Sequence, residues 1–152
     1  MRLQKIVDKI SFKKVFNRER YFKTIDKCFS DSNYVEFHKN GLCGIGTTNF
    51  SKHYAAWNAL KGKNVLYVGH NPNYFLDECQ MKFGGSRRYP SNNLCFKSGG
   101  KVEAISIHSD FYYYRGENKD LVILDESSNK EILDMAKPMV AYSKGQILSI
   151  LS

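Results

Sequence analysis

The clearest strand pattern in the chain is NVLYV at residues 64–68. This run is almost wholly apolar, which is typical of a strand covered on both faces of a parallel sheet. A second apolar run, LVIL at residues 121–124, is followed by Asp125 and Glu126. Helical patterns lie on both sides of the first run and after the second. This alternation predicts an α/β domain built around a largely parallel sheet.

The rest of the chain extends this pattern in both directions. Apolar periodicity and capping residues predict helices at residues 2–15, 18–29, 48–60, 73–83 and 129–136, the last ending before Pro138. Strands are predicted at residues 34–37, 64–68, 121–124 and 147–151, and a hairpin pairs residues 94–97 with residues 102–107. Residues 84–93, GGSRRYPSNN, are expected to form a loop.

Length and hydropathy limit the class of protein. The 152 residues suit a single domain with one packed core. No run approaches the roughly 18 apolar residues of a membrane span, and the first ten residues lack the apolar core of a signal peptide. We therefore expect a cytoplasmic protein that does not contact a membrane. The four cysteines have no zinc-finger spacing, so we expect free thiols and no zinc.

The formal net charge of +8 is concentrated near the N-terminus. Residues 1–27 contain nine Lys and Arg against three Asp and Glu, so they contribute +6 of it. Such a segment either forms a solvated helix face or contacts a polyanion such as double-stranded DNA, here through Lys5, Lys9, Lys13 and Lys14. Arg87 and Arg88, next to Tyr89, either hold phosphate and stack on a base or lie in an exposed polar loop.

A glycine-rich segment, GLCGIGTT at residues 41–48, has the spacing of the phosphate-binding loop G-x-x-x-x-G-K-[ST], with Thr47 in place of the lysine. Glycines let backbone N–H groups face an anion, and the helix that follows adds its positive end. Thr48 then offers a hydroxyl to Mg²⁺. The alternative is a tight turn before a helix. The glycines concerned are Gly41, Gly44 and Gly46.

The acidic pair after the second apolar run matches the Walker B pattern of ATPases. In this interpretation Asp125 holds Mg²⁺ through water, and Glu126 is the catalytic residue that polarises the attacking water. The alternative is a strand that ends in solvated acids. The order of the motifs, with the glycine-rich segment upstream and strands between, favours the ATPase interpretation.

These motifs, in this order, resemble the ATPase domain of the large terminase subunit, the motor that packages DNA into the heads of tailed phages and herpesviruses. The similarity extends over nearly the whole chain. FNRERYF at residues 16–22 is similar to the segment that helps seat adenine, and GQILSILS at residues 145–152 is similar to the strand that leads into the coupling motif. Between them lie four further segments that match in order: the glycine-rich segment at 41–48, NVLYVGHN at 64–71, the Ser98–Gly100 turn, and Arg115-Gly116 before the run at 121–126.

The resemblance implies a fold and a set of ligands. The fold is a P-loop NTPase-like three-layer sandwich over residues 31–152, preceded by a basic helical segment at residues 1–30. The cofactors are ATP and Mg²⁺, and the resemblance adds Lys39 and Arg115 to the nucleotide contacts. The partners are double-stranded DNA and terminase, portal or other packaging subunits, in the cytoplasm of the host cell.

Departures from the family pattern lower the expected activity. Thr47 stands where the family has a lysine, so the ammonium that holds the β- and γ-phosphates is missing. Lys39 is the candidate to supply that ammonium instead. Loss of a charged group aimed at the transferred phosphate costs about 3–4 kcal/mol, or roughly 10²–10³ in rate. The given sequence also stops at Ser152, inside or just before the coupling motif, so we expect neither the coupling step nor the DNA cutting of the family's nuclease domain.

We therefore expect weak or absent nucleotide binding and little hydrolysis, in a protein that modulates DNA packaging by binding DNA or a packaging component. Two alternatives stay open. One is an active ATPase core, either a fragment or one half of a split motor. The other is a DNA-binding module without an enzymatic role.

Overall fold

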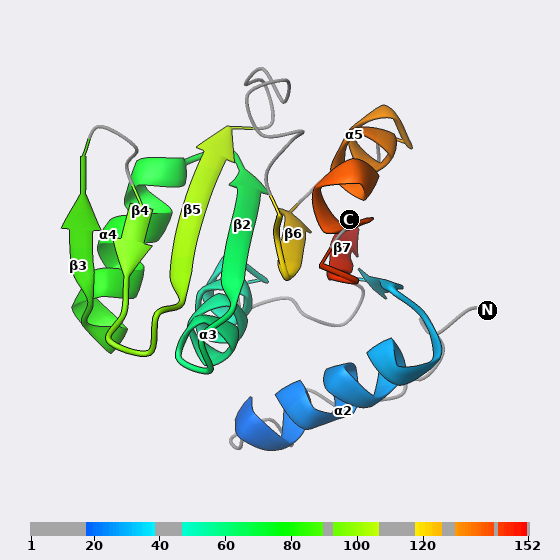
Figure 1. Ribbon diagram of the computed structural model, residues 1–152, viewed down its shortest axis with the longest axis horizontal. Helices are drawn as coiled ribbons and strands as arrows, with labels where there is room; N and C mark the ends of the chain where they lie inside the picture. The colour runs from blue at the N-terminus through cyan, green and yellow to red at the C-terminus, as the bar shows by residue number, and fades with distance from the viewer. Residues whose placement is uncertain are drawn as a thin grey trace.

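The computed structural model describes residues 18–38, 47–89, 93–106, 118–125, 130–141 and 143–151. Within these ranges, helices surround a seven-stranded sheet (Figure 1). The helices are α2 (Arg18–Asp31), α3 (Thr47–Ala59), α4 (Pro72–Phe83) and α5 (Lys130–Ala141). The strands are β1 (Tyr34–His38), β2 (Asn64–Gly69), β3 (Ser86–Arg88), β4 (Asn93–Cys95), β5 (Lys101–Ser106), β6 (Leu121–Asp125) and β7 (Gln146–Leu151). None of these helices is long and apolar enough to cross a lipid bilayer.

The sheet is mixed but mostly parallel. Its strand order is β1-β7-β6-β2-β5-β4-β3, in which the first five strands run parallel and the last two pair antiparallel. Strand β2 is central, because Val65 lies opposite Leu121 of β6 on one side and Val102 of β5 on the other. This arrangement confirms the predicted α/β class with a largely parallel sheet. The helix predicted at residues 2–15 lies outside the described residues.

Successive side chains of β2 point into two different apolar layers. Val65 and Tyr67 belong to a cluster with buried residues of α2, α3 and α4. Leu66 and Val68 belong to a second cluster that includes Met139 of α5. Helices therefore cover both faces of the sheet (Figure 1), so the central strands are apolar at nearly every position rather than at alternate ones.

Helix α3 runs back along the sheet, so that its N-terminus lies at the carboxyl ends of the parallel strands. Its last carbonyl, of Ala59, accepts a 2.7 Å hydrogen bond from Ser98 Oγ in the turn before β5, at the opposite edge. A 13-residue helix is about 20 Å long, close to the length of a six-residue strand. Residues Thr47 and Thr48 therefore start the helix level with the carboxyl edge of the sheet.

The hairpin predicted around residues 98–100 is present. Strand β4 pairs antiparallel with β5, with Leu94 opposite Val102. Gly99 has a φ of +90°, a conformation that other residues rarely adopt. Gly100 packs so closely on the Ala59 carbonyl that a Cβ atom would overlap it. This turn therefore needs both glycines, for two different reasons.

A short strand, β3, replaces part of the loop predicted at residues 84–93. Its middle residue, Arg87, lies opposite Leu94 of β4. Gly84 and Gly85 have φ values of +80° and +95°, which turn the chain sharply from α4 into this strand. The prediction failed because the strand is short and polar. It is held by backbone pairing with β4, and its sequence has no apolar alternation that would indicate a strand.

Helix α5 continues through Pro138 to Ala141, so the prediction that it ends at residue 136 is wrong. Proline has no N–H to donate to the carbonyl one turn earlier, which normally ends or kinks a helix. Here the residues after the proline are held by packing, because Met139 is 0% exposed and Val140 is buried against the sheet. Burial of these two side chains offsets the missing backbone hydrogen bond.

Candidate functional site

Asp125 is the last residue of β6 and lies at the carboxyl edge of the sheet. Only 1% of this residue is exposed. Its Oδ2 atom accepts a 2.6 Å hydrogen bond from the hydroxyl of Tyr67. Asp125 is thus a buried, hydrogen-bonded acid at the end of an apolar strand. The alternative of a solvated acid is wrong for this residue.

The ring of Tyr67 packs against Phe75 and over Gly69, and these two contacts hold its hydroxyl beside Asp125. Its ring stacks on Phe75 of α4, with centroids 3.6 Å apart and planes 9° from parallel. The ring also crosses Gly69, where a Cβ atom would overlap the Tyr67 hydroxyl. A glycine two residues after the tyrosine therefore leaves the space through which the hydroxyl reaches the acid on the next strand.

The bond between Tyr67 and Asp125 spans two neighbouring strands whose following helices lie on opposite faces. Strand β2 leads into α4, which packs in the cluster with α2 and α3, whereas β6 precedes α5 in the second cluster. Such a reversal is a topological switch point, and ligands of α/β proteins bind in the crevice at the carboxyl ends of strands there. Asp125 therefore lies at the point of the sheet where the fold class predicts a ligand.

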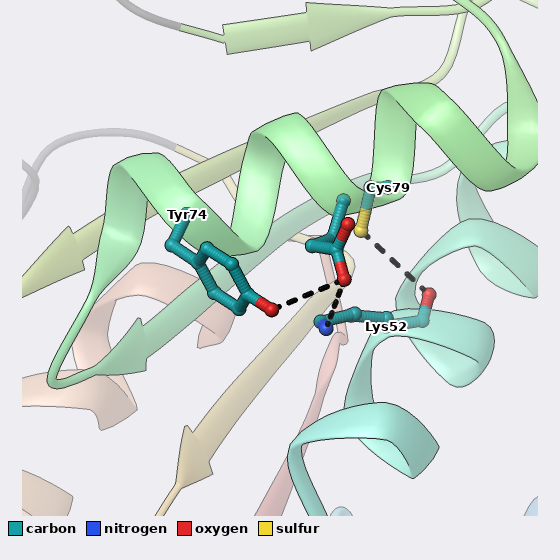
Figure 2. Close-up of polar contacts among 4 residues, drawn as sticks. Lys52, Tyr74 and Cys79 are labelled. Carbon is teal, nitrogen blue, oxygen red and sulfur yellow. Dashed lines mark hydrogen bonds and ion pairs between the residues drawn. The ribbon is translucent and has the colours of Figure 1, made fainter.

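A charged cluster lies between α3 and α4, which cover the same face of the sheet (Figure 2). The ammonium of Lys52 is 3.5 Å from Glu78 Oε1, and the same oxygen accepts a 3.2 Å hydrogen bond from the Tyr74 hydroxyl. The ammonium also lies 5.0 Å from the centre of the Tyr74 ring. Lys52 is only 5% exposed, so this cluster holds a buried cation on the helix that follows the glycine-rich segment.

The charge of Glu78 keeps Tyr74 protonated, and burial keeps Cys79 protonated. The negative charge of Glu78 raises the pKa of Tyr74, which stays a hydrogen-bond donor. Burial raises the pKa of the Cys79 thiol to about 12, against a smaller opposing effect of Lys52. The Cys79 sulfur lies 3.9 Å from the Lys52 carbonyl oxygen (Figure 2). A thiol in this state is not a nucleophile at neutral pH.

The structure describes only some of the predicted site residues. Asp125 and the backbone of Thr47 and Thr48 both lie at the carboxyl edge of the sheet. The other predicted nucleotide and catalytic residues lie outside the described residues: Lys39, Gly41, Gly44, Gly46, Arg115 and Glu126. So do the lysines predicted to contact DNA: Lys5, Lys9, Lys13 and Lys14.

The two arginines predicted to contact nucleic acid do not lie on one face of the sheet. They are consecutive residues of β3 and so point to opposite faces of the sheet. Arg87 forms an ion pair with Asp77 of α4 and has a side chain that is only 8% exposed. Arg88 is exposed. The expectation of an exposed polar loop is therefore wrong for Arg87. DNA contact stays a prediction for both arginines.

Comparison of the chain with protein-family models, characterised proteins and solved structures gives no match.

The described residues contain no group of three or more His, Cys, Asp and Glu side chains that would enclose a metal ion. Magnesium in nucleotide sites does not need such a cage, because it is held by one or two carboxylates and by the phosphates themselves. Asp125 is the described carboxylate that the sequence predicts for this role. The oxygen donors predicted here, a carboxylate and the Thr48 hydroxyl, suit a hard cation.

Sequence patterns did not predict the polar contacts of Tyr67, beside the candidate site, or of Lys52, on the helix that begins there. The signal for Tyr67 was a phenol within an otherwise apolar strand, because a buried tyrosine hydroxyl usually finds a polar partner. Its partner lies 58 residues away, so the pair becomes visible only in the fold. Lys52 gave no comparable signal, since a lysine on an amphipathic helix is normally solvated.

Proposed function

We propose that this chain is a terminase-like P-loop domain that binds Mg²⁺ and ATP weakly at the carboxyl edge of its sheet, hydrolyses ATP slowly and modulates DNA packaging. One observation carries the proposal: Asp125, a buried acid at a strand end, lies on the sheet edge where α3 begins. That helix begins at Thr47, within the glycine-rich segment at residues 41–48. A phosphate loop and a metal-binding acid need this relationship.

The path of the chain supports the same conclusion. Strands β1 and β2 are separated in the sheet by β7 and β6, so α3, which connects them, passes across the face of β6. We therefore expect the N-terminus of α3 to lie near the carboxyl end of β6, where Asp125 is located. A helix N-terminus carries a partial positive charge and free N–H groups, which favour phosphate.

Each residue has a defined task in this proposal. Asp125 and the Thr48 hydroxyl hold Mg²⁺, directly or through water, and the ion offsets phosphate charge when it is bound. The glycine-rich backbone holds the phosphates, with Lys39 in place of the missing lysine. Lys52 is committed to Glu78 and Tyr74 in the described structure, so we assign it a structural task.

Titration calorimetry with ATP, in Mg²⁺ and in EDTA, tests the proposal beside a phosphate-release assay. We expect weak binding that is tighter in Mg²⁺, and Asp125→Asn should remove that difference. Asp120→Asn is the matched control, because Asp120 lies just before the first residue of β6, at the end remote from Asp125, and accepts a hydrogen bond from the Asn64 N–H. Absence of ATP binding in both buffers would contradict the proposal. Fast hydrolysis that Glu126→Gln abolishes would instead support an active ATPase core.

A second candidate function is DNA binding without nucleotide. Residues 79–102 contain five Lys and Arg and no acid, and Arg88 is exposed within them. Phosphate contacts of this kind weaken steeply as salt rises. Fluorescence anisotropy with a DNA duplex at several salt concentrations tests this function, with Arg88→Ala, and with the four lysines at residues 5–14 neutralised together. Affinity that is unchanged in both variants would exclude these side chains as contacts.

A further inference from the structure

We infer that Tyr67 is the positioning residue for Asp125: its hydroxyl orients the carboxylate toward the bound Mg²⁺ of the nucleotide. This inference rests on the proposed function, in which Asp125 holds the ion. It adds a residue from the neighbouring strand, β2, that no phosphate-loop or acidic motif in the sequence includes. The 2.6 Å hydrogen bond to Oδ2 is the contact that carries it.

The tyrosine is rigid enough to set the orientation of another side chain. The stack on Phe75 fixes the plane of the ring, and the close approach to Gly69 fixes its height above the strand. Tyr67 is itself 3% exposed, so its hydroxyl cannot turn toward solvent without opening the packing between β2 and α4. The position of the hydroxyl is therefore set by the fold, and that of the carboxylate follows from it.

The chemistry of this hydrogen bond suits a metal-binding acid. An ionised carboxylate has about four lone-pair positions, and one O–H donor uses only one of them. A phenol at neutral pH is uncharged, so its bond leaves the negative charge on Asp125, where a lysine partner would cancel much of it. The bond also reduces the cost of burying the carboxylate. Tyr67 thus orients the acid without neutralising it.

The protein contains a second tyrosine that serves as a matched control. Tyr54 of α3 is 0% exposed, and its hydroxyl donates a 2.8 Å hydrogen bond to Asp26 Oδ1. Tyr54 and Tyr67 belong to the same apolar cluster. Removing either hydroxyl costs one hydrogen bond between a buried phenol and a carboxylate. Only one of these carboxylates lies at the proposed nucleotide site.

The experiment compares Tyr67→Phe with Tyr54→Phe by calorimetric titration of ATP in Mg²⁺ and in EDTA. Loss of a residue that orients a metal ligand typically lowers metal affinity 10- to 100-fold. We expect Tyr67→Phe to reduce the Mg²⁺-dependent gain in ATP affinity by at least about 10-fold and to leave the affinity in EDTA unchanged. Tyr54→Phe should change neither value. Mn²⁺ binding followed by electron paramagnetic resonance gives a second readout that does not depend on hydrolysis.

Further variants separate this inference from the proposed function. If Asp125→Asn removes the Mg²⁺ effect and Tyr67→Phe does not, the inference is overturned and the proposed function stands. If wild-type protein shows no Mg²⁺ effect, both are overturned. Should Tyr67→Phe fail to fold, Gly69→Ala retains the hydroxyl and displaces it from the acid. In that variant an unchanged Mg²⁺ effect in a folded protein overturns the inference.

Discussion

Lys119 and Glu103 form a buried ion pair. The ammonium of Lys119 lies 3.0 Å from Glu103 Oε2, and the two side chains are 1% and 9% exposed. A second lysine, Lys101, lies 3.0 Å from Glu103 Oε1 but has a side chain that is 34% exposed. The ion pair connects Lys119, just before β6, with Glu103 of β5, which is two strands away in the sheet. It supplies two predictions about stability.

Removing the buried lysine should destabilise the fold strongly. Lys119→Met leaves the Glu103 carboxylate without its buried partner, and breaking such a pair typically costs about 3–5 kcal/mol. Lys101→Met is the control, since a partly exposed pair contributes only about 0–1 kcal/mol. Urea denaturation followed by circular dichroism measures both free energies of unfolding. Equal losses in the two variants would contradict this assignment.

The same glutamate should make stability depend on pH. Burial by itself raises the pKa of Glu103, but the charge of Lys119 and the bonds from Lys119 and Lys101 outweigh it and lower the pKa below 4.5. Because the folded-state pKa is below the unfolded-state value, the ionised form stabilises the fold above pH 4.5. That stabilisation is lost as the pH falls through the folded-state pKa.

Glu103→Gln checks the pH dependence. Urea unfolding of the wild type between neutral and acidic pH should show a falling free energy of unfolding. The glutamine variant should be less stable at neutral pH and should lose less on acidification. A variant curve parallel to that of the wild type would mean that Glu103 is not the group responsible.

The two glycines of the turn before β5 should respond differently to alanine. Gly100→Ala places a Cβ atom against the Ala59 backbone, so α3 or β5 must move, at a cost of about 1–3 kcal/mol. Gly99→Ala meets no atom within 4 Å but must keep a φ of +90°, at a cost of about 1–2 kcal/mol. Thermal unfolding of both variants compares them. The Gly100 variant should also lose helix packing, visible as faster amide exchange at the end of α3.

Cys79 and Cys95 should differ in their rates of alkylation. Cys79 is 0% exposed and its pKa is raised to about 12 by burial, so it should resist alkylation in the native protein. Cys95 is a free, partly exposed thiol and should react much faster. Iodoacetamide labelling followed by peptide mass spectrometry measures the two rates. Labelling of Cys79 at the rate of Cys95 in native protein would show that the α3–α4 contact opens readily.

Thr47→Lys should restore the missing cation at the start of α3. If the rest of the nucleotide site is intact, the added ammonium should raise the rate of ATP hydrolysis by roughly 10²–10³. Thr47→Gln is a control of similar length without the charge. Phosphate release with saturating ATP measures the effect. A lysine variant no faster than the glutamine variant would show that Thr47 is not the defect that limits turnover.

The sequence predicted those elements whose apolar pattern reflects burial. Strands β2 and β6 were recognised because helices cover them on both sides, and the hairpin because glycines punctuate it. Strand β3 was missed because it is held by backbone pairing with β4 and by polar side chains. The continuation of α5 past Pro138 was missed because the packing of Met139 outweighs a local rule.

The site could be predicted only in part. The place of Asp125 after an apolar run predicted its position at a strand end, and periodicity predicted the helix at residues 48–60; both features are present, while the metal-binding role of Asp125 stays a prediction. Tyr67 was not identified, because a hydrogen bond between residues on neighbouring strands depends on their register rather than on any local spacing. The same limit applies to Lys52 and Glu78, which meet through the packing of two helices.

The position of β7 has a consequence for how the chain reaches its native state. This strand, at residues 146–151, lies between β1 and β6, so Val35 near the start of the described chain pairs with Leu148 near its end. During synthesis β1 cannot pair with β7 until residues 146–151 have left the ribosome. Formation of this part of the sheet is therefore a long-range step, and a chain that lacks β7 would leave β1 and one side of β6 open to association with other chains.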